Sequence, residues 1–323
     1  MTTRTRLWLA FGLTVASTAA LVALVGFRPT THPSEAARIG VVRSSDEMEA
    51  TLASPGPVRV ETIVGADWEV DRSGLVNLSH PEAKRAGLED GPEPIHIYLH
   101  VLRHPTRGTF LVDTGVERAL RDDPEQAAIR GMVASFMGVE KMKVSTDTAS
   151  FVAQEKGAIA GVFLTHLHLD HVSGMPDVPK AATVFTGPGE AAARGALNVF
   201  VQGSTDRALA GHPPLAELPF AADPSGRFAG VLDLFGDQSV FAIWVPGHTP
   251  GSVAYLARTP TGPVLFVGDT CHTAWGWQHG VEPGTFTADH ARNATSLAAL
   301  RALAERHPAM TVRLGHQELA ARD

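Results

Sequence analysis

Apolar runs that end in metal-binding residue types constrain this chain more than any other feature of its sequence. The run Gly161 to Leu164 is typical of a buried strand, and three histidines and an aspartate follow it closely. These four residues are His166, His168, Asp170 and His171. Because alternate side chains of an extended chain lie on one face, the first two histidines and the aspartate are expected to point the same way. The last histidine follows where the chain turns toward a helix.

Three later apolar runs follow the same rule, each with one such residue beyond its end. Those residues are His248, Asp269 and His316. Imidazole and carboxylate are ligands of zinc and similar divalent metals, and a catalytic site keeps one position open for water. One His-x-His pair is unremarkable among 15 histidines, but this repetition at four strand ends is not. We therefore predict that the seven residues converge on two adjacent metal ions.

This ordered set resembles the metallo-β-lactamase superfamily of hydrolases. The segment Leu-Val-Asp-Thr-Gly at 111–115 is also similar to an early strand and turn of that family. The resemblance covers roughly residues 58–323 and implies an α+β fold, an αββα sandwich of two mixed sheets with helices outside. It also implies two metal sites bridged by Asp269, with His166, His168 and His248 holding the first metal and Asp170, His171 and His316 the second.

Within the superfamily, the motifs are most similar to the N-acyl homoserine lactonase branch. That branch implies a small-molecule substrate with an apolar acyl tail, whose lactone ring is opened by a hydroxide shared by two metals. It often carries a tyrosine three residues beyond the bridging aspartate, where this chain has His272. A histidine there would be able to supply the proton instead, or serve only as a structural residue. Asp170 is expected to bind metal and orient the site rather than act as a free base. Zinc is the default metal, although iron, manganese and cobalt accept the same ligands.

Other functions stay open at this point. A secreted phosphotriesterase of the methyl parathion hydrolase kind shares the ligands and is the main alternative. A glyoxalase II-like thioesterase is less favoured, as is a β-lactamase, because β-lactamases lack a carboxylate at the position of Asp269. A mononuclear iron persulfide dioxygenase uses only part of the ligand set, and a non-catalytic binding module would not need all of it. No Gly-x-Ser-x-Gly motif supports a serine hydrolase. The balance of 27 basic against 34 acidic residues, with no basic stripe, disfavours nucleic-acid binding.

The N-terminal 28 residues differ from the rest of the chain. Leu7 to Phe27 is a run of 21 residues without a charge, preceded by two arginines. Its length fits a bilayer-spanning anchor, and its small residues also fit a signal peptide. Either predicts an extracytoplasmic domain, exported or held at the membrane, whereas a buried core helix is the alternative. Residues 29–57 contain Pro, Ser and Thr without periodicity and are predicted to be a linker, which leaves 58–323 as the hydrolase domain.

Four other segments give local expectations. Residues 95–102 alternate as a half-buried strand, with His96, Tyr98 and His100 on the face that is expected to meet water rather than to bind metal. Residues 116–152 predict either an amphipathic helix packed on the domain or a mobile cap over an apolar substrate groove. Residues 193–230 predict a further loop-rich insertion. A last helix with a buried leucine stripe is predicted from a cap at 287–290 to His307-Pro308.

Five side chains near the expected ligands have two interpretations each. Cys271, the only cysteine of the chain, is either a small buried hydrophobe, which is the default, or a ligand or nucleophile. Thr249 and Ser252 either orient the imidazole of His248 or only cap the turn that follows it. Trp275 and Trp277 either wall an apolar pocket or pack in the core.

Overall fold

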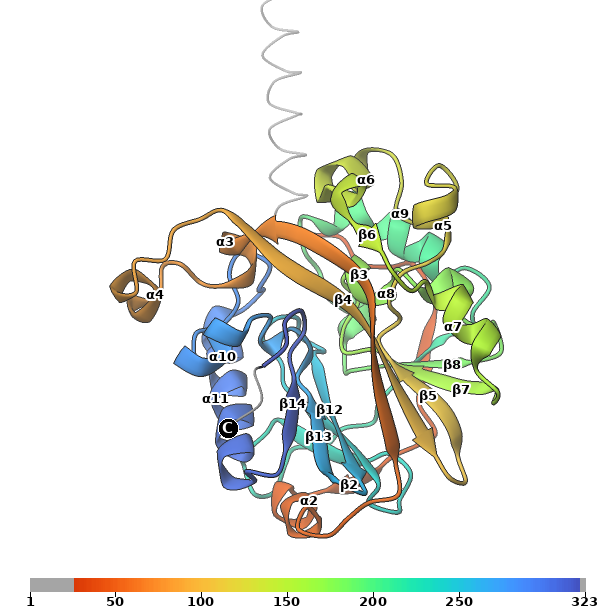
Figure 1. Cartoon of the computed structure of the whole chain (residues 1–323). Helices are drawn as coiled ribbons and strands as arrows, with labels where there is room; N and C mark the ends of the chain where they lie inside the picture. Colours follow the sequence, from red (N-terminus) through yellow and green to blue (C-terminus); the bar gives the residue numbers. More distant parts are fainter. Residues whose placement is uncertain (1–25, 320–323) are drawn as a thin grey trace, which may run out of the picture.

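The computed structural model describes residues 26–319 and arranges their strands in two mixed sheets (Figure 1). The larger sheet has the strand order β1-β9-β8-β7-β5-β4-β3-β6. Neighbouring strands are parallel from β1 to β5 in that order and antiparallel from β5 to β6. In chain order the strands are Ser34–Ala36 (β1), Arg59–Asp71 (β3), Pro92–His104 (β4), Gly108–Val112 (β5), Lys143–Val144 (β6), Ile159–Phe163 (β7), Thr183–Thr186 (β8) and Leu215–Glu217 (β9).

The smaller sheet has the order β14-β13-β12-β11-β10-β2. All of its pairs are antiparallel except β13 with β14. Its strands are Val41–Arg43 (β2), Gly230–Asp233 (β10), Val240–Trp244 (β11), Val253–Thr259 (β12), Gly262–Phe266 (β13) and Thr311–Arg313 (β14).

Three hydrophobic clusters separate four layers of secondary structure. The cluster between the sheets is aromatic: the rings of Phe110 and Phe163 stack with centroids 5.0 Å apart, and Tyr255 lies 5.4 Å from Phe163. A second cluster fills the space between the larger sheet and the helices α7 (Thr148–Gln154) and α9 (Asn198–Leu209). A third lies between the smaller sheet and the helices α2 (Ser45–Thr51) and α11 (His290–Arg306). This layering confirms the predicted αββα sandwich.

Helix α11 forms as its sequence predicts. The side chain of Asp289 accepts a hydrogen bond from the backbone N–H of Arg292 and so caps the first turn. Leu297, Leu300 and Leu303 form the buried stripe, and the helix ends at Arg306, before Pro308. Truncating one of these leucines to alanine would cost about 2–5 kcal/mol of stability, because each fills a site closed to water.

The strand predicted at 95–102 is part of β4, but most of its expected wet face is buried. β4 is an interior strand of its sheet, and the ring of His100 lies 4.7 Å from that of Phe266 in the opposing sheet. Tyr98 is buried as well, and burial lowers the pKa of His100 to about 3. The expectation fails at Tyr98 and His100, because the opposing sheet covers this face there, whereas His96 stays partly exposed.

The prediction that residues 29–57 form a linker is wrong for residues 34–51, which contain two strands and a helix. β1 and β2 add one edge strand to each sheet, and α2 follows with a capping box between Ser44 and Glu47. Met48 of that helix is fully buried, and Glu49 accepts hydrogen bonds from Arg306 on α11. Residues 1–25, where the membrane anchor or signal peptide was predicted, lie outside the described residues. Among residues 26–319, no helix is both long enough and apolar enough to cross a membrane.

The insertion at 116–152 consists of short helices rather than one long amphipathic helix. Val133, Ala134 and Met137 of α6 (Met132–Met137) pack on the core, whereas Met132 and Phe136 point outward. The insertion at 193–230 is less loop-rich than predicted, since it contains α9. The remaining helices are Arg72–Leu75 (α3), Pro81–Arg85 (α4), Ala119–Asp122 (α5), Leu169–Val172 (α8) and Ala274–His279 (α10), with 3-10 turns at Val139–Lys141 (η1), Met175–Asp177 (η2), Glu190–Ala192 (η3) and Gly268–Thr270 (η4).

Candidate metal centre

The seven predicted residues meet at one edge of the sandwich, where strands of both sheets end. The loop after β7 and the helix α8 contribute four of them, and the loops after β11, β13 and β14 contribute one each. In that order the residues are His166, His168, Asp170, His171, His248, Asp269 and His316. All are buried except His168 and Asp170, which are partly accessible.

Helix α11 positions two of these loops. Ser296 donates a hydrogen bond of 2.8 Å to the carbonyl oxygen of Pro246, two residues before the histidine of that loop. Asn293 donates one of 3.0 Å to the carbonyl oxygen of Thr270, the residue after Asp269. Gly247 has a φ of +150° and faces Asn293 so closely that a Cβ would meet its backbone. Helix α11 therefore holds the loop of His248 and the loop of Asp269 in place.

Asp269 lies in the middle of the cluster. Its Oδ2 is 3.6 Å from Nε2 of His166 and 3.4 Å from Nε2 of His248. The same oxygen is 3.2 Å from Nε2 of His171, and Oδ1 is 3.3 Å from Nε2 of His316. One carboxylate therefore faces histidines from four different loop positions.

The ligand atoms form two groups that share this carboxylate. Within each group the atoms lie within 4.8 Å of one another. The first group is His166, His168, His248 and Asp269; the second is Asp170, His171, Asp269 and His316. The sequence-predicted residues thus come together with the division that the family resemblance implies.

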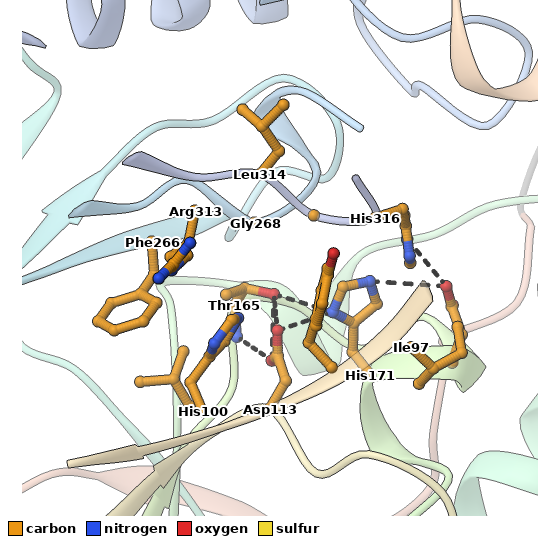
Figure 2. A pocket seen from close by; sticks show the side chains of 14 residues that line it. Ile97, His100, Asp113, Thr165, His171, Phe266, Gly268, Arg313, Leu314 and His316 are labelled. Carbon is orange, nitrogen blue, oxygen red and sulfur yellow. Dashed lines mark hydrogen bonds and ion pairs between the residues drawn. The ribbon is translucent and has the colours of Figure 1, made fainter. Parts of the chain in front are cut away.

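Hydrogen bonds on the far side of the rings aim their Nε2 atoms into the centre. Figure 2 shows Thr165, Asp113 and His171 joined in this way, and Nδ1 of His171 lies 2.8 Å from Oδ2 of Asp113. The backbone N–H of Thr165 donates to Oδ1 of the same carboxylate at 2.8 Å. Nδ1 of His316 donates to the carbonyl oxygen of His96 at 2.9 Å. When these Nδ1 atoms carry the proton, each Nε2 presents a lone pair to the centre.

The buried polar atoms of the site fit metal ions better than they fit each other. Nε2 of His166, Nε2 of His171 and Oδ1 of Asp269 are buried without a hydrogen-bond partner among the described residues. Unpaired buried groups of this kind are costly, and imidazole nitrogens with carboxylate oxygens are a donor set that divalent cations accept. The residues present therefore fit two cations that share Asp269.

The charges of the site favour cations as well. Burial, followed by the neighbouring imidazoles, holds the pKa of His166 and His248 well below the ordinary value. Burial opposes the ionisation of Asp269, but His171, His272 and His316 together keep its pKa well below the usual range. Burial also opposes protonation of His316, yet the carboxylates around it raise its pKa to about 10. Without metal, protonated histidines such as His316 therefore balance the charge of the carboxylates. Bound cations would displace these protons.

Glu190 is a buried carboxylate near the site that the sequence does not single out. It accepts hydrogen bonds from the backbone N–H groups of Leu167, at 2.9 Å, and Gly251, at 3.0 Å. It also accepts one from Thr249 Oγ1 at 2.7 Å, and burial raises its pKa. It thereby ties the first histidine loop to the loop of His248. No motif marks this residue, because its partners lie far from it in the sequence.

Thr249 and Ser252 cap their turn rather than orient the imidazole. The backbone N–H of Thr249 donates to Oγ of Ser252 at 2.9 Å, and neither hydroxyl contacts His248. Nδ1 of His248 instead lies 3.4 Å from Oγ1 of Thr287. The two hydroxyls therefore stabilise the turn and do not orient the imidazole of His248.

His272 reaches the centre from its edge. Its Nε2 lies 2.9 Å from Oδ2 of Asp269, and its Nδ1 lies 3.3 Å from the carbonyl oxygen of Leu75. The side chain is buried and faces the ring of His248 at 5.2 Å and that of His316 at 5.3 Å. The structure thus places His272 against the carboxylate of Asp269.

Tyr98 also lies near the ligands, although its alternation in the sequence predicts a position on a water-facing strand. It lines a cavity of about 10 Å³, roughly the room that one water needs, together with Asp170, His171 and His316. Its hydroxyl is buried without a partner among residues 26–319, and burial raises its pKa. The sequence placed it on a wet strand face, so this proximity to the centre was not predicted.

Cys271 is the buried hydrophobe that the sequence predicts. Its thiol packs with α11, its pKa is raised by burial to about 12, and it belongs to neither ligand group. Trp277 packs in the same core. Trp275 is half-buried against the other helical layer and stacks on His279 at 4.2 Å. Both tryptophans therefore contribute to packing rather than to the cavity beside the ligands.

Comparison with known proteins agrees with this geometry. The sequence model described as "Metallo-beta-lactamase superfamily" matches residues 90–316. An N-acyl homoserine lactonase, AttM, of Rhizobium radiobacter is 32% identical over 225 residues, which cover 69% of this chain and 81% of the relative. The AttM lactonase of Azorhizobium caulinodans is 29% identical over 230 residues, with the same two coverages.

Solved structures show the same fold. A quorum-quenching N-acyl homoserine lactone lactonase superimposes with a TM-score of 0.57 at 16% identity, covering 81% of this chain and 93% of that one. The dizinc quorum-quenching lactonase AidC gives a TM-score of 0.53 at 15% identity, covering 86% and 91%. Together with the family match over most of the domain, these findings show that the chain belongs to the metallo-beta-lactamase superfamily and is a metal-dependent hydrolase.

Proposed function

We propose that this hydrolase opens lactone rings, or cleaves closely related carboxylic esters, at a centre of two divalent cations bridged by Asp269. The observation that carries the proposal is the position of that carboxylate between two complete ligand groups. The lactonase names of the sequence relatives support the substrate class. Zn²⁺ is the resident metal that we propose, in keeping with the donor set and with the dizinc lactonase of the same fold. The substrate is a small molecule with an apolar tail, and nucleic acid is not a partner.

His166, His168 and His248 would hold one cation, and Asp170, His171 and His316 the other. When bound, such a pair lowers the pKa of a shared water and polarises the substrate carbonyl. Oδ2 of Asp170 lies 3.2 Å from Nε2 of His316, as two ligands of one cation would, so Asp170 would serve as a ligand rather than as a free base.

We assign His272 the role of proton carrier for the leaving alkoxide. Nδ1 can donate to the carbonyl oxygen of Leu75, which fixes the ring and leaves Nε2 on the side of the centre. Nε2 then carries the lone pair, so it would take up the proton that the attacking water releases and hand it to the ring oxygen as the acyl bond breaks. An imidazole is suited to this task near neutral pH, and it stands where related lactonases often carry a tyrosine.

The test is a substrate panel combined with metal analysis of the full chain purified without added metal. The panel contains N-acyl homoserine lactones, simple aryl esters, β-lactams and aryl phosphotriesters. We expect about two bound cations per chain and the highest kcat/KM on a lactone or ester. Faster turnover of phosphotriesters would favour the phosphotriesterase alternative, and one cation per chain would refute the bridged centre.

We also propose that the uncharged run Leu7 to Phe27 places the domain outside the cytoplasm, as an anchor or as a cleaved signal. Fractionation of cells that express the full chain, followed by N-terminal sequencing of the mature protein, tests this. A mature chain that starts at Met1 in the membrane fraction indicates an anchor, and one that starts within the run indicates cleavage. A chain recovered only from the cytoplasm would overturn the proposal.

A further inference from the structure

One end of the molecule exposes an unusual group of large apolar side chains. We call it the apolar face; its members come from α6 and from the start of α9, and they are Met132, Phe136, Leu197, Val199 and Phe200. Met132 is 86% exposed and Phe136 82%, while Leu197 and Phe200 are 64% and 67% exposed. The two helices contact each other and lie next to one another in Figure 1. Elsewhere the described residues expose only three large hydrophobic side chains, Val41, Val42 and Phe286.

The composition of both helices sets this face apart from an ordinary wet surface. No charged residue occurs from 131 to 139 or from 195 to 205. In α6, Val133, Ala134 and Met137 already pack on the core, so the outer side chains are not needed for folding. A helix that is apolar on all sides is normally covered on all sides, either by protein or by lipid. Contiguous exposed apolar surface of this kind marks an interaction site.

The beginning of the described chain lies directly beside the apolar face. Phe27 and Gly195 exchange two backbone hydrogen bonds of 3.0 Å, two residues before Leu197. Asn198, in the first turn of α9, donates a further hydrogen bond of 2.8 Å to the carbonyl oxygen of Phe27. The 21 uncharged residues that end at Phe27 are long enough to span a bilayer. The face therefore stands where that run meets the domain.

Basic side chains border the same place. Arg28 and Arg194 are both exposed, and Arg194 donates to the carbonyl oxygen of Gly26. Arginines in this position suit lipid phosphates, because they can remain in the headgroup layer while apolar neighbours enter the acyl chains. Phenylalanine, leucine and methionine are residue types found on the buried side of interfacial helices.

We propose that the apolar face of α6 and α9 is a membrane-contact surface that enters the headgroup and acyl boundary of a lipid bilayer. Helix α9, which carries part of this face, also contacts α8, the helix of Asp170 and His171. The inference stands on the surface and on the start of the described chain, and it does not depend on which substrate is hydrolysed.

The experiment uses the full chain reconstituted into vesicles of phosphatidylcholine and phosphatidylglycerol. A bimane probe is attached to Phe136→Cys or to Phe200→Cys, and vesicles with brominated acyl chains serve as quencher. The matched control is Val42→Cys, an exposed apolar position on β2 that lies far from α6 in Figure 1. Native Cys271 is buried, so the introduced thiol is the reactive one, and the unsubstituted chain gives the background. The replaced side chains are exposed, so these substitutions should leave the fold intact.

We expect a blue-shifted probe at 136 and at 200, quenched several-fold more strongly by brominated lipid than the probe at 42. Every chain in the comparison carries the same N-terminal run, so the difference reports the face and not the anchor. Equal, weak quenching at all three positions would overturn the proposal. So would a blue shift without lipid that grows with protein concentration, which indicates a second copy, or one produced by a long-chain lactone alone, which indicates an acyl groove.

Discussion

The replacement Asp113→Asn tests whether the carboxylate behind His171 sets the affinity of the second metal site. Asp113 accepts hydrogen bonds from the backbone N–H of Thr165 at 2.8 Å, from its hydroxyl at 2.9 Å, and from Nδ1 of His171 at 2.8 Å. An asparagine has to turn its NH₂ group toward one of these donors. If the NH₂ group faces the backbone N–H of Thr165, two donors meet and the N–H loses its acceptor, which costs about 1–3 kcal/mol.

Facing the histidine, the NH₂ group forces the ring proton of His171 onto Nε2. That atom is the one aimed at Asp269, 3.2 Å from its Oδ2, so the ring would no longer present a lone pair to a cation. Loss of an orienting partner of this kind lowers metal affinity by about 10–100-fold. At about 1.4 kcal/mol per factor of ten, the variant should lose about 1.4–2.8 kcal/mol of binding free energy at the second site.

The assay is a zinc titration of the metal-free protein against a chelator of known affinity, which resolves two binding steps. We expect the step assigned to Asp170, His171 and His316 to shift and the step assigned to His166, His168 and His248 to stay close to that of the unsubstituted protein. The matched control is Asp237→Asn, which removes a carboxylate 2.9 Å from Nε2 of His104, away from the centre. Two unshifted binding steps in Asp113→Asn would show that Asp113 does not set the affinity of the second site, as would equal shifts in both variants.

Four further predictions follow from the same geometry. Asp269→Ala should remove most activity and about half of the bound metal, measured by elemental analysis; full occupancy would contradict the bridge. Gly315→Ala should reduce metal content, because its Cβ would collide with Oδ1 of Asp269, whereas Gly157→Ala, whose nearest neighbour atom lies 3.5 Å away, should keep it. His272→Gln should lower kcat about 10²–10⁴-fold on a lactone with metal retained, and much less on an aryl ester with a good leaving group; equal losses on both would exclude a proton carrier. Burial raises the pKa of Glu117 to about 7, so this carboxyl binds its proton more tightly in the folded than in the unfolded state. Its stabilising contribution is present at acid pH and lost as pH rises toward 7, so Glu117→Gln should raise Tm at pH 8 more than at pH 5; the opposite order would show that the shift is misassigned.

The ligand set could be predicted from sequence because the signal is local. An apolar run of strand length, followed by a histidine or aspartate, places that side chain at a sheet edge, and the runs before His166, His248 and Asp269 all behave this way. Helix α11 was predictable for a similar reason, since its cap, its leucine stripe and its end all lie within a short segment. The division of the seven residues between two metals came from the resemblance to a known family.

What the sequence did not predict depends on contacts between distant segments. β1 and β2 have three residues each, too few for a periodic pattern, and they are strands only because β9 and β10 offer free edges. His100 alternates as if it faced water, but the second sheet covers it. Glu190 has no motif, because its partners belong to loops that fold against it. The apolar spacing in α6 predicts that its large side chains pack on the domain, but Met132 and Phe136 face outward.

The central claim is that two cations share the carboxylate of Asp269, and anomalous X-ray scattering measures this most directly. Crystals of the zinc-loaded full chain would be measured just above and just below the zinc absorption edge. We expect two anomalous peaks, one among His166, His168 and His248 and one among Asp170, His171 and His316, each within reach of an oxygen of Asp269. A single peak, or two peaks of which one lies out of reach of Asp269, would contradict it.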